Sequence, residues 1–153
     1  MEIERKFLVK KVPQELDQYE MQEMQQAYLC DDPVIRVRSI RQKDVMEYVL
    51  TIKGRGMVIR EEHELPLSKE KFEQLLEKRE GRILSKKRYR IPLSDGHVAE
   101  LDVYEGDYAG MYTVEVEFKD EKDLAGFQVP VWFGEDVSEE RRYKNSTLCM
   151  GKC

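Results

Sequence analysis

Pairs of charged side chains two residues apart recur along this chain, and their chemical types suit the binding of a metal ion together with an anion. The opening segment Met1–Val9 carries Glu2, Glu4 and Lys6. The later pairs are Arg36/Arg38, Glu62/Glu64, Lys86/Arg88, Glu100/Asp102 and Glu115/Glu117. Because side chains alternate across a strand, residues two apart lie on the same face. Each pair therefore predicts a strand with one charged face.

These charged faces have two possible orientations. If they point outward, they are solvated surface, and the protein is a plain barrel or sandwich without a site on these strands. For a single strand this is the more common arrangement, because charged residues are rarely buried. If the faces point inward, they line a water-filled barrel in which each charge must be paired, hydrated or coordinated. The recurrence of the pattern favours the inward arrangement.

In the inward arrangement the lumen contains an acidic set and a basic set. The acidic set is Glu2, Glu4, Glu62, Glu64, Asp102, Glu115 and Glu117, and the basic set is Lys6, Arg36, Arg38, Lys53, Arg60, Lys86 and Arg88. Hard divalent cations prefer carboxylate oxygen atoms. The arginine fork suits phosphate oxygens, and lysine supplies a point charge. A metal-bound polyphosphate satisfies both sets at once, so this arrangement predicts metal-assisted phosphoryl chemistry.

The elements that must position these residues are mostly strands. We expect strands at 1–9, 22–30, 34–39, 46–53, 57–65, 82–93, 97–104 and 111–119, with a loop or edge segment at 129–134. Ser68–Glu80 predicts the one long helix, which begins at Ser68 and is closed by Gly81. Shorter helical segments are expected near 12–16, at 120–126 and from Ser138 towards Cys149. About eight strands with inserted helices favour an antiparallel meander that closes on itself over a parallel sheet.

Composition narrows the class of protein. A length of 153 residues suits one domain spanning 1–153, and a net charge of −5 does not suggest a broad nucleic-acid-binding surface. Since no apolar run could cross a bilayer and the charged N-terminus does not resemble a signal peptide, we expect a cytoplasmic protein. Cys30, Cys149 and Cys153 form no CxxC motif and are expected to be free thiols. His63 and His97 lack a catalytic partner and are expected to be structural.

The charged motifs resemble those of a known family. Glu2-Ile3-Glu4-Arg5-Lys6-Phe7 resembles the E-x-E-x-K signature of the CYTH superfamily, the triphosphate tunnel metalloenzymes. Further elements resemble the family in order: 36–38, 51–54, 60–64, 86–89, 100–102 and 115–118. Gly134–Ser138 and Arg142–Ser146 are similar to the family's G-x-E-V-T and R-Y-x-N-S endings. Asp136 and Ser138 stand where Glu and Thr are usual, in a segment that we expect to serve packing.

The resemblance implies an α+β, mainly β fold: an eight-stranded antiparallel barrel that forms a tunnel with flanking helices. It also implies a divalent cation, Mg²⁺ or Mn²⁺, and a small anionic triphosphate as partner, with no nucleic acid and no membrane. Small members of the family look most like tripolyphosphatases. We therefore expect hydrolysis of inorganic tripolyphosphate to pyrophosphate and phosphate, by a monomer or homodimer.

The resemblance and the charge sets together assign roles to the residues. Metal binding is assigned to Glu2, Glu4, Glu115 and Glu117, with Glu62, Glu64 and Asp102 as further or water-mediated ligands. Phosphate binding is assigned to Lys6, Arg36, Arg38, Lys53, Arg60, Lys86 and Arg88. Glu4, Lys6 and Lys86 are the catalytic candidates, Lys86 as an alternative activator of water because a lysine among cations can have a lowered pKa. The alternatives are a class IV-type adenylate cyclase, a thiamine or nucleoside triphosphatase, and a non-enzymatic binding barrel.

Overall fold

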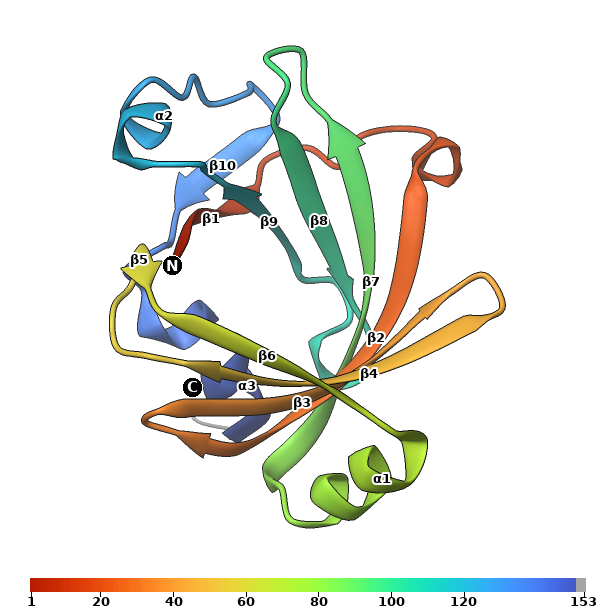
Figure 1. Cartoon of the computed structure of the whole chain (residues 1–153). Coiled ribbons are helices and arrows are strands. Elements are labelled where there is room, and N and C mark those ends of the chain that lie inside the picture. Colours follow the sequence, from red (N-terminus) through yellow and green to blue (C-terminus); the bar gives the residue numbers. More distant parts are fainter. Residues whose placement is uncertain (151–153) are drawn as a thin grey trace.

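The computed structural model describes residues 1–150, which form a single antiparallel sheet curled into a barrel (Figure 1). Over these residues the strands are β1 (Glu2–Val9), β2 (Glu20–Asp31), β3 (Val34–Gln42), β4 (Val45–Lys53), β5 (Ile59–Arg60), β6 (Glu62–Leu67), β7 (Glu80–Pro92), β8 (Val98–Tyr104), β9 (Tyr112–Glu117) and β10 (Phe133–Asp136). The helices are α1 (Lys69–Glu77), α2 (Glu121–Ala125) and α3 (Asn145–Met150). The predicted mainly β fold is confirmed.

The barrel wall follows the order β1-β9-β8-β7-β2-β3-β4-β6, and β5 then pairs with β1. That last pairing places Arg60 opposite Glu2 and Ile59 opposite Ile3, which returns the end of the sheet to its beginning. The expected count of eight strands describes this wall, but the sheet has ten. The predicted strand 57–65 is divided into β5 and β6 at Glu61, and β10 pairs along the edge of β1.

The predicted long helix is confirmed at its start and is shorter at its end. The Ser68 hydroxyl accepts a hydrogen bond from the backbone N–H of Lys71 at 3.1 Å, which is the expected N-cap of α1. The helix ends at Glu77 because Glu80 already belongs to β7. Phe72 of α1 packs on Tyr48 of β4, so the helix covers the outside of the wall at β3 and β4.

The helix expected near residues 12–16 is absent from the structure. Only a 3₁₀ turn, η1 (Leu16–Gln18), forms there, and Pro13 lies outside it. Glu15 has a φ of 56°, in the left-handed region, so the backbone before Leu16 cannot continue as a right-handed helix. The segment serves as a connection between β1 and β2.

The C-terminal helix expected to start at Ser138 starts later in the structure. The chain instead forms a 3₁₀ turn, η3 (Arg141–Tyr143), and then α3. The Ser138 hydroxyl accepts a hydrogen bond from the backbone N–H of Lys6 at 2.9 Å, and the Val137 N–H donates to the Lys6 carbonyl at 2.8 Å. Pairing with β1 therefore takes the place of helix formation.

The apolar faces of β1, β8 and β9 form the main core on the outside of the wall. Phe7, Leu101, Val114 and Val116 are fully buried there, beneath α2, the segment that follows it, and β10. Phe133 of β10 packs on Phe7 with ring centroids 5.0 Å apart. Since these strands turn their apolar faces to the covering elements, their charged faces must turn to the lumen.

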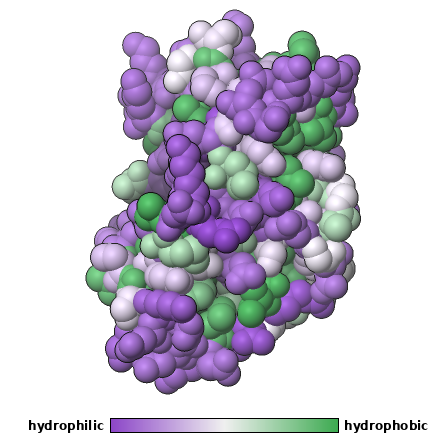
Figure 2. All heavy atoms as spheres, turned by 90° about the vertical axis from the view of Figure 1, so that its right-hand side faces the viewer, coloured by the Kyte–Doolittle hydropathy of each residue, from purple (hydrophilic) through white to green (hydrophobic). Residues whose placement is uncertain are grey.

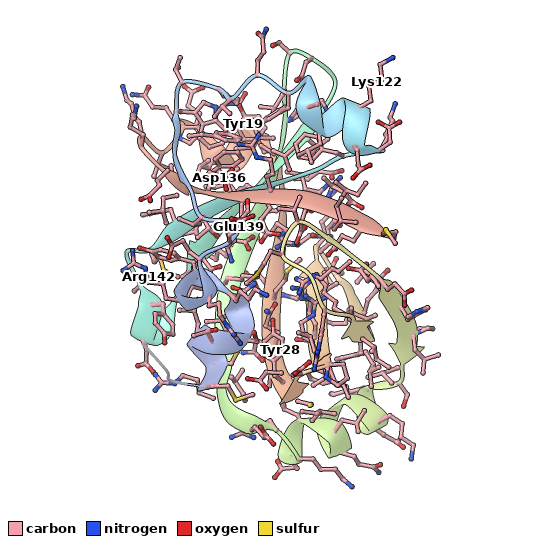
Figure 3. The ribbon with its side chains drawn as sticks, turned by 90° about the vertical axis from the view of Figure 1, so that its left-hand side faces the viewer. Tyr19, Tyr28, Lys122, Asp136, Glu139 and Arg142 are labelled. Atoms are coloured by element: carbon pink, nitrogen blue, oxygen red, sulfur yellow. The ribbon has the colours of Figure 1, made fainter. Side chains whose placement is uncertain are left out.

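A second apolar cluster closes one end of the barrel. Leu148 and Cys149 of α3 pack against Tyr28, Leu84 and Tyr104 of the wall. Figure 3 shows Tyr28 in the interior, beside the ribbon of α3. Cys149 and Cys30 are free thiols, as expected, and Cys153 lies outside the described residues.

The face of the molecule shown in Figure 2 is mainly hydrophilic. On this face, apolar side chains are scattered among polar ones. Within residues 1–150, no helix combines the length and the apolar character that crossing a membrane requires.

Candidate active site

A cavity of about 240 Å³ lies inside the barrel, and its lining is dominated by charged side chains. All members of the predicted acidic and basic sets line it except Asp102 and Lys86. The inward orientation of the charged faces is therefore what the structure shows. Burial of the apolar faces under α1, α2 and β10 is the physical reason for that orientation.

The carboxylates gather on one side of the cavity because of the strand register. In the pairing of β1 with β9, Glu4 lies opposite Glu117 and Lys6 lies opposite Glu115. In the pairing of β8 with β9, Glu100 lies opposite Glu115. The carboxylates of β1 and β9 therefore lie side by side, and Glu100 of β8 lies next to them.

Arginines line the opposite side, where β2, β3 and β4 meet. Arg36 Nη2 donates to Thr51 Oγ1 at 3.0 Å, and Arg38 Nε donates to Gln26 Oε1 at 2.8 Å. Arg36 Nε has no hydrogen-bond partner within residues 1–150, although it is buried. Burial, together with the charges of Arg36 and Arg88, lowers the pKa of Arg38 to about 9. An anion in the cavity would relieve both conditions, because it would accept hydrogen bonds and offset the crowded positive charge.

Lys53 connects the two sides. Its ammonium lies 3.0 Å from Glu2 Oε1 and 3.4 Å from Glu62 Oε2. Arg60 Nε approaches the same Glu2 oxygen at 3.6 Å. Burial raises the pKa of Glu2, and the neighbouring Glu62 carboxyl adds to the rise. Cations of the protein thus neutralise only part of this carboxylate cluster.

The remaining carboxylates repel one another. Burial, with the charge of Glu115, raises the pKa of Glu4 to about 8. Burial and the charge of Glu2 likewise raise the pKa of Glu117. For Glu115, burial is outweighed by the charges of Lys6 and Arg88, which lower its pKa. Such a group of oxygen donors with excess negative charge fits a hard divalent cation.

These residues do not form a complete metal cage. In the described part of the chain, no three or more carboxylate, histidine or cysteine side chains are arranged as a full set of metal ligands. Mg²⁺ usually takes only one or two protein carboxylates and completes its shell with water and substrate phosphates. The lining residues therefore fit a cation that arrives together with a phosphate ligand.

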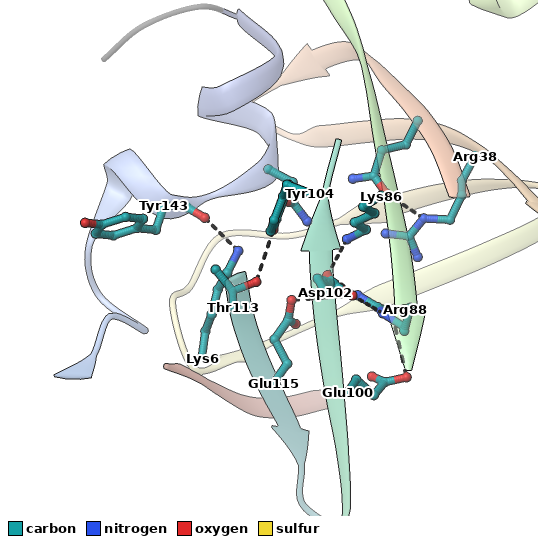
Figure 4. Close-up of polar contacts among 12 residues, drawn as sticks. Lys6, Arg38, Lys86, Arg88, Glu100, Asp102, Tyr104, Thr113, Glu115 and Tyr143 are labelled. Atoms are coloured by element: carbon teal, nitrogen blue, oxygen red, sulfur yellow. Dashed lines mark hydrogen bonds and ion pairs between the residues drawn. The ribbon is translucent and has the colours of Figure 1, made fainter. Parts of the chain in front are cut away.

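Asp102 and Lys86 share the lumen-facing side of β8 and β7 with the lining residues Glu100 and Arg88, but they are not part of the cavity lining (Figure 4). The Lys86 ammonium is 2.6 Å from Asp102 Oδ2, and both side chains are fully buried. Arg88 donates from Nε to Asp102 Oδ1 at 2.8 Å and from Nη2 to Oδ2 at 3.0 Å. Both oxygens of Asp102 are occupied, so its carboxylate positions Arg88, which does line the cavity.

The pKa values of this buried group follow from its pairing. Burial lowers the pKa of Lys86 to about 7, although the charge of Asp102 opposes the change. Burial alone would raise the pKa of Asp102, but the charges of Arg88 and Lys86 outweigh burial and lower this pKa to about 2. Asp102 is thus ionised throughout the physiological range.

The C-terminal segment contributes lining residues that were absent from the predicted set. They are Val137, Ser138, Glu140, Tyr143, Lys144, Asn145 and Ser146. The Lys6 ammonium donates to the Tyr143 carbonyl at 2.6 Å, which joins the segment to β1. Burial and the nearby charge of Arg60 lower the pKa of Lys144, so this lysine adds to the positive side. The R-Y-x-N-S motif was the sequence signal that marked this segment.

Four other lining residues were also missed, namely Glu100, Tyr28, Val34 and Met57. Glu100 lines the cavity, with its Oε2 atom 3.7 Å from Arg88 Nη1. Its position two residues before Asp102 was the feature of the sequence that could have identified it. Tyr28 lines it from β2 and had no charge to identify it. Neither histidine belongs to the lining. His97 instead joins the β7–β8 hairpin to α2, with its ring nitrogens 2.8 Å from Asp95 and 2.9 Å from Asp123.

Comparison with known proteins agrees with this geometry. The CYTH domain family matches residues 1–145. The inorganic triphosphatase of Nitrosomonas europaea is 39% identical over 149 residues, which cover 97% of each chain. The inorganic triphosphatase of Acetivibrio thermocellus is 31% identical, over 96% of this chain and 92% of the relative. The crystal structure of the inorganic triphosphatase NE1496 superimposes with a TM-score of 0.68 at 38% identity, covering 98% of this chain and 95% of that one.

Proposed function

The chain belongs to the CYTH family, and from that premise we propose that it is a divalent-metal-dependent triphosphatase that cleaves inorganic tripolyphosphate to pyrophosphate and phosphate. One observation carries the proposal: a single cavity is lined both by a set of carboxylates and by a set of arginines and lysines, of which Arg36 and Arg38 lie apart from the carboxylates on β3. A metal-bound triphosphate satisfies both sets. The names of the two curated relatives support the same substrate.

The carboxylate side would hold Mg²⁺ or Mn²⁺. We assign this role to Glu2, Glu4, Glu115 and Glu117, with Glu62 and Glu64 as further or water-mediated ligands. A bound cation neutralises charge on phosphate oxygens and increases the acidity of a bound water molecule. Asp102 was predicted in this set, but its two oxygens already accept hydrogen bonds from Arg88 and Lys86. We therefore propose a positioning role for Asp102 and for Lys86.

The cationic side holds the phosphate chain. We assign Lys6, Arg36, Arg38, Lys53, Arg60 and Arg88 to its oxygen atoms, and we add Lys144 from the C-terminal segment. Phosphoryl transfer spreads negative charge over oxygen atoms, and fixed cations in a buried cavity stabilise that charge without reorganisation. An attacking water molecule must also lose a proton. Glu4 and Glu117 lie opposite each other in register, within the carboxylate group that would hold the cation and its bound water.

The lining fits a compact polyanion better than a nucleoside. Among the wall residues, apolar side chains are few, and the cavity of about 240 Å³ is smaller than typical pockets for drug-sized ligands, which begin at roughly 300 Å³. A cyclase needs a surface on which a purine base can stack. This favours tripolyphosphate over ATP.

The test is a comparison of substrates with Mg²⁺ present. Tripolyphosphate, ATP and thiamine triphosphate are incubated with the protein, and phosphate, pyrophosphate and cyclic AMP are measured. We expect the highest kcat/KM for tripolyphosphate, with orthophosphate as a product. Cyclic AMP with pyrophosphate from ATP would establish the cyclase alternative instead. The absence of any product, with binding retained, would establish a binding barrel. The cytoplasmic location and the monomeric or homodimeric state stay predictions.

Replacing Arg38 should mainly weaken substrate binding. Arg38 is buried at the cavity wall, and hydrogen bonds to charged groups contribute about 1.5–3 kcal/mol each. We expect Arg38→Ala to raise KM for tripolyphosphate about tenfold to hundredfold, with a smaller effect on kcat. Steady-state kinetics of phosphate release provides the measurement.

The same strand offers a matched control. Arg41 lies on β3 with a side chain 55% exposed, and it pairs with Glu23 on the outer surface. Arg41→Ala should leave KM within about twofold, because exposed ion pairs contribute little. Equal effects of the two substitutions would mean that Arg38 does not contact the substrate.

A further inference from the structure

Gln26 of β2 is an uncharged residue, buried beside Arg38 on the lumen face of the wall. Its side chain is completely inaccessible to solvent, and it does not line the cavity. Arg38 lies opposite it in the pairing of β2 with β3. The amide oxygen accepts from Arg38 Nε at 2.8 Å, and the amide nitrogen donates to the Tyr28 hydroxyl at 3.1 Å. Gln26 therefore connects two side chains that do line the cavity.

The direction of both hydrogen bonds follows from the chemistry of the partners. An arginine N–H can only donate, so the oxygen of the Gln26 amide must face Arg38. The NH₂ group must then face Tyr28, and the Tyr28 oxygen acts as the acceptor. Arg36 lies opposite Tyr28 in register and is also only a donor. The Tyr28 hydroxyl proton consequently has no acceptor on either of these sides, which leaves the cavity that Tyr28 lines as the direction in which an acceptor could lie.

The ionisation of Tyr28 agrees with this direction. Burial raises the pKa of Tyr28, although the charges of Arg36 and Arg38 oppose the change. The hydroxyl group therefore keeps its proton near neutral pH. Within residues 1–150 it donates no hydrogen bond to another side chain, so it is available as a donor to a ligand.

We propose that Gln26 is a positioning residue, which fixes the guanidinium of Arg38 and directs the Tyr28 hydroxyl proton towards the oxygens of the bound triphosphate. This inference rests on the proposed function for the identity of the ligand. A fully buried amide stabilises the fold only through its hydrogen bonds, since an unpaired buried polar group costs free energy. Here both hydrogen bonds lead to the cavity.

The test replaces Gln26 by an apolar side chain of similar length. Gln26→Met removes both hydrogen bonds, and Gln25→Met is the matched control, because Gln25 is the adjacent, outward-facing and exposed residue. Both variants are also made with Tyr28→Phe. The readouts are kcat and KM for tripolyphosphate, the affinity for tripolyphosphate in chelator, and thermal unfolding.

We expect Gln26→Met to lower kcat/KM about tenfold to hundredfold, as for the loss of one or two hydrogen bonds that involve a charged group. In the Tyr28→Phe background its effect should be smaller by about threefold or more, because part of it passes through Tyr28. Gln25→Met should stay within about twofold of the wild type. The idea is overturned if Gln26→Met matches the Gln25→Met control, or if its effect is unchanged by Tyr28→Phe.

Two further measurements distinguish a positioning role of Gln26 from a folding defect and from a failure of the proposed function. If Gln26→Met does not fold, Gln26→Glu replaces it: the carboxylate still accepts from Arg38 but cannot donate to Tyr28, so a loss confined to the Tyr28-dependent part is expected. The Arg38 Nε–H resonance, followed by NMR in the protein without substrate, should exchange slowly with water in the wild type. Fast exchange there would contradict the Gln26 contact even in an active triphosphatase. A slow resonance in a protein without triphosphatase activity would contradict the proposed function alone.

Discussion

The Glu4→Gln variant is expected to lose about a thousandfold in kcat on tripolyphosphate, as a buried group that acts on developing charge typically contributes. Glu4 lines the cavity opposite Glu117 in the pairing of β1 with β9, and burial, together with the charge of Glu115, raises its pKa to about 8. Glutamine keeps the size but removes the charge that a divalent cation needs. Single-turnover phosphate release at saturating Mg²⁺ measures the loss.

The control for this variant is Glu61→Gln, between β5 and β6. Its side chain is 73% exposed, outside the cavity, so the same change of charge should alter kcat by less than about twofold. Thermal unfolding should show that Glu4→Gln is folded and no less stable than the wild type, because it removes a repulsive carboxylate. A variant with unchanged kcat would exclude Glu4 from the metal-binding group.

The Asp102→Asn variant is expected to lose about 3–5 kcal/mol of unfolding free energy at pH 7, the range for breaking a buried ion pair. Asp102 is the shared counter-charge of Lys86 and Arg88, at distances of 2.6–3.0 Å. Without it, Arg88 loses its nearest counter-charge in a buried site, and Lys86 loses the charge that favours its protonated form. Urea denaturation at constant ionic strength gives the free energy.

The pH dependence of this loss has a defined sign. The pKa of Asp102 falls from 3.8 to about 2 on folding, so its stabilisation is complete above the unfolded value and disappears as the pH falls towards the folded value. The difference between wild type and variant should therefore persist at pH 5 and shrink below about pH 4. Asp107→Asn removes the exposed partner of Arg82 and should cost less than about 1 kcal/mol. A similar cost for both variants would contradict the role of Asp102.

The strand positions could be predicted because alternation is a local property. Arg36-Val37-Arg38 and Glu115-Val116-Glu117 define two-residue periods that no helix accommodates. The same alternation cannot say which face is inside. That choice depends on what covers the apolar face, and here Phe127 and Phe133, far away in the sequence, cover Phe7 and Val116.

The depth of a residue could not be predicted either. Glu100 and Asp102 share one face of β8, yet the side chain of Glu100 is 21% exposed and that of Asp102 only 1%. The difference arises because Asp102 lies where α3 and Tyr104 close the end of the barrel, and alternation carries no information on position along the axis. Asp102 was consequently expected among the metal ligands, and the structure places it behind Arg88.

Uncharged residues escaped the sequence analysis for a different reason. Gln26 and Tyr28 interrupt no pattern of charge, so nothing distinguished them from other strand residues. The helix expected at Ser138 had the local signature of an N-cap, Ser138-Glu139-Glu140. The hydrogen bonds of Val137 and Ser138 with Lys6 of β1 overrode that local preference.

A divalent cation and a triphosphate are expected to occupy this cavity together. The direct measurement is ³¹P NMR of tripolyphosphate with chelator-treated protein, while Mg²⁺ or Mn²⁺ is added in steps. We predict that no cleavage occurs before metal is added, and that pyrophosphate and phosphate then appear in equal amounts at a rate that rises with metal until it saturates. Cleavage in the presence of chelator, or none at any concentration of either metal, would contradict the account.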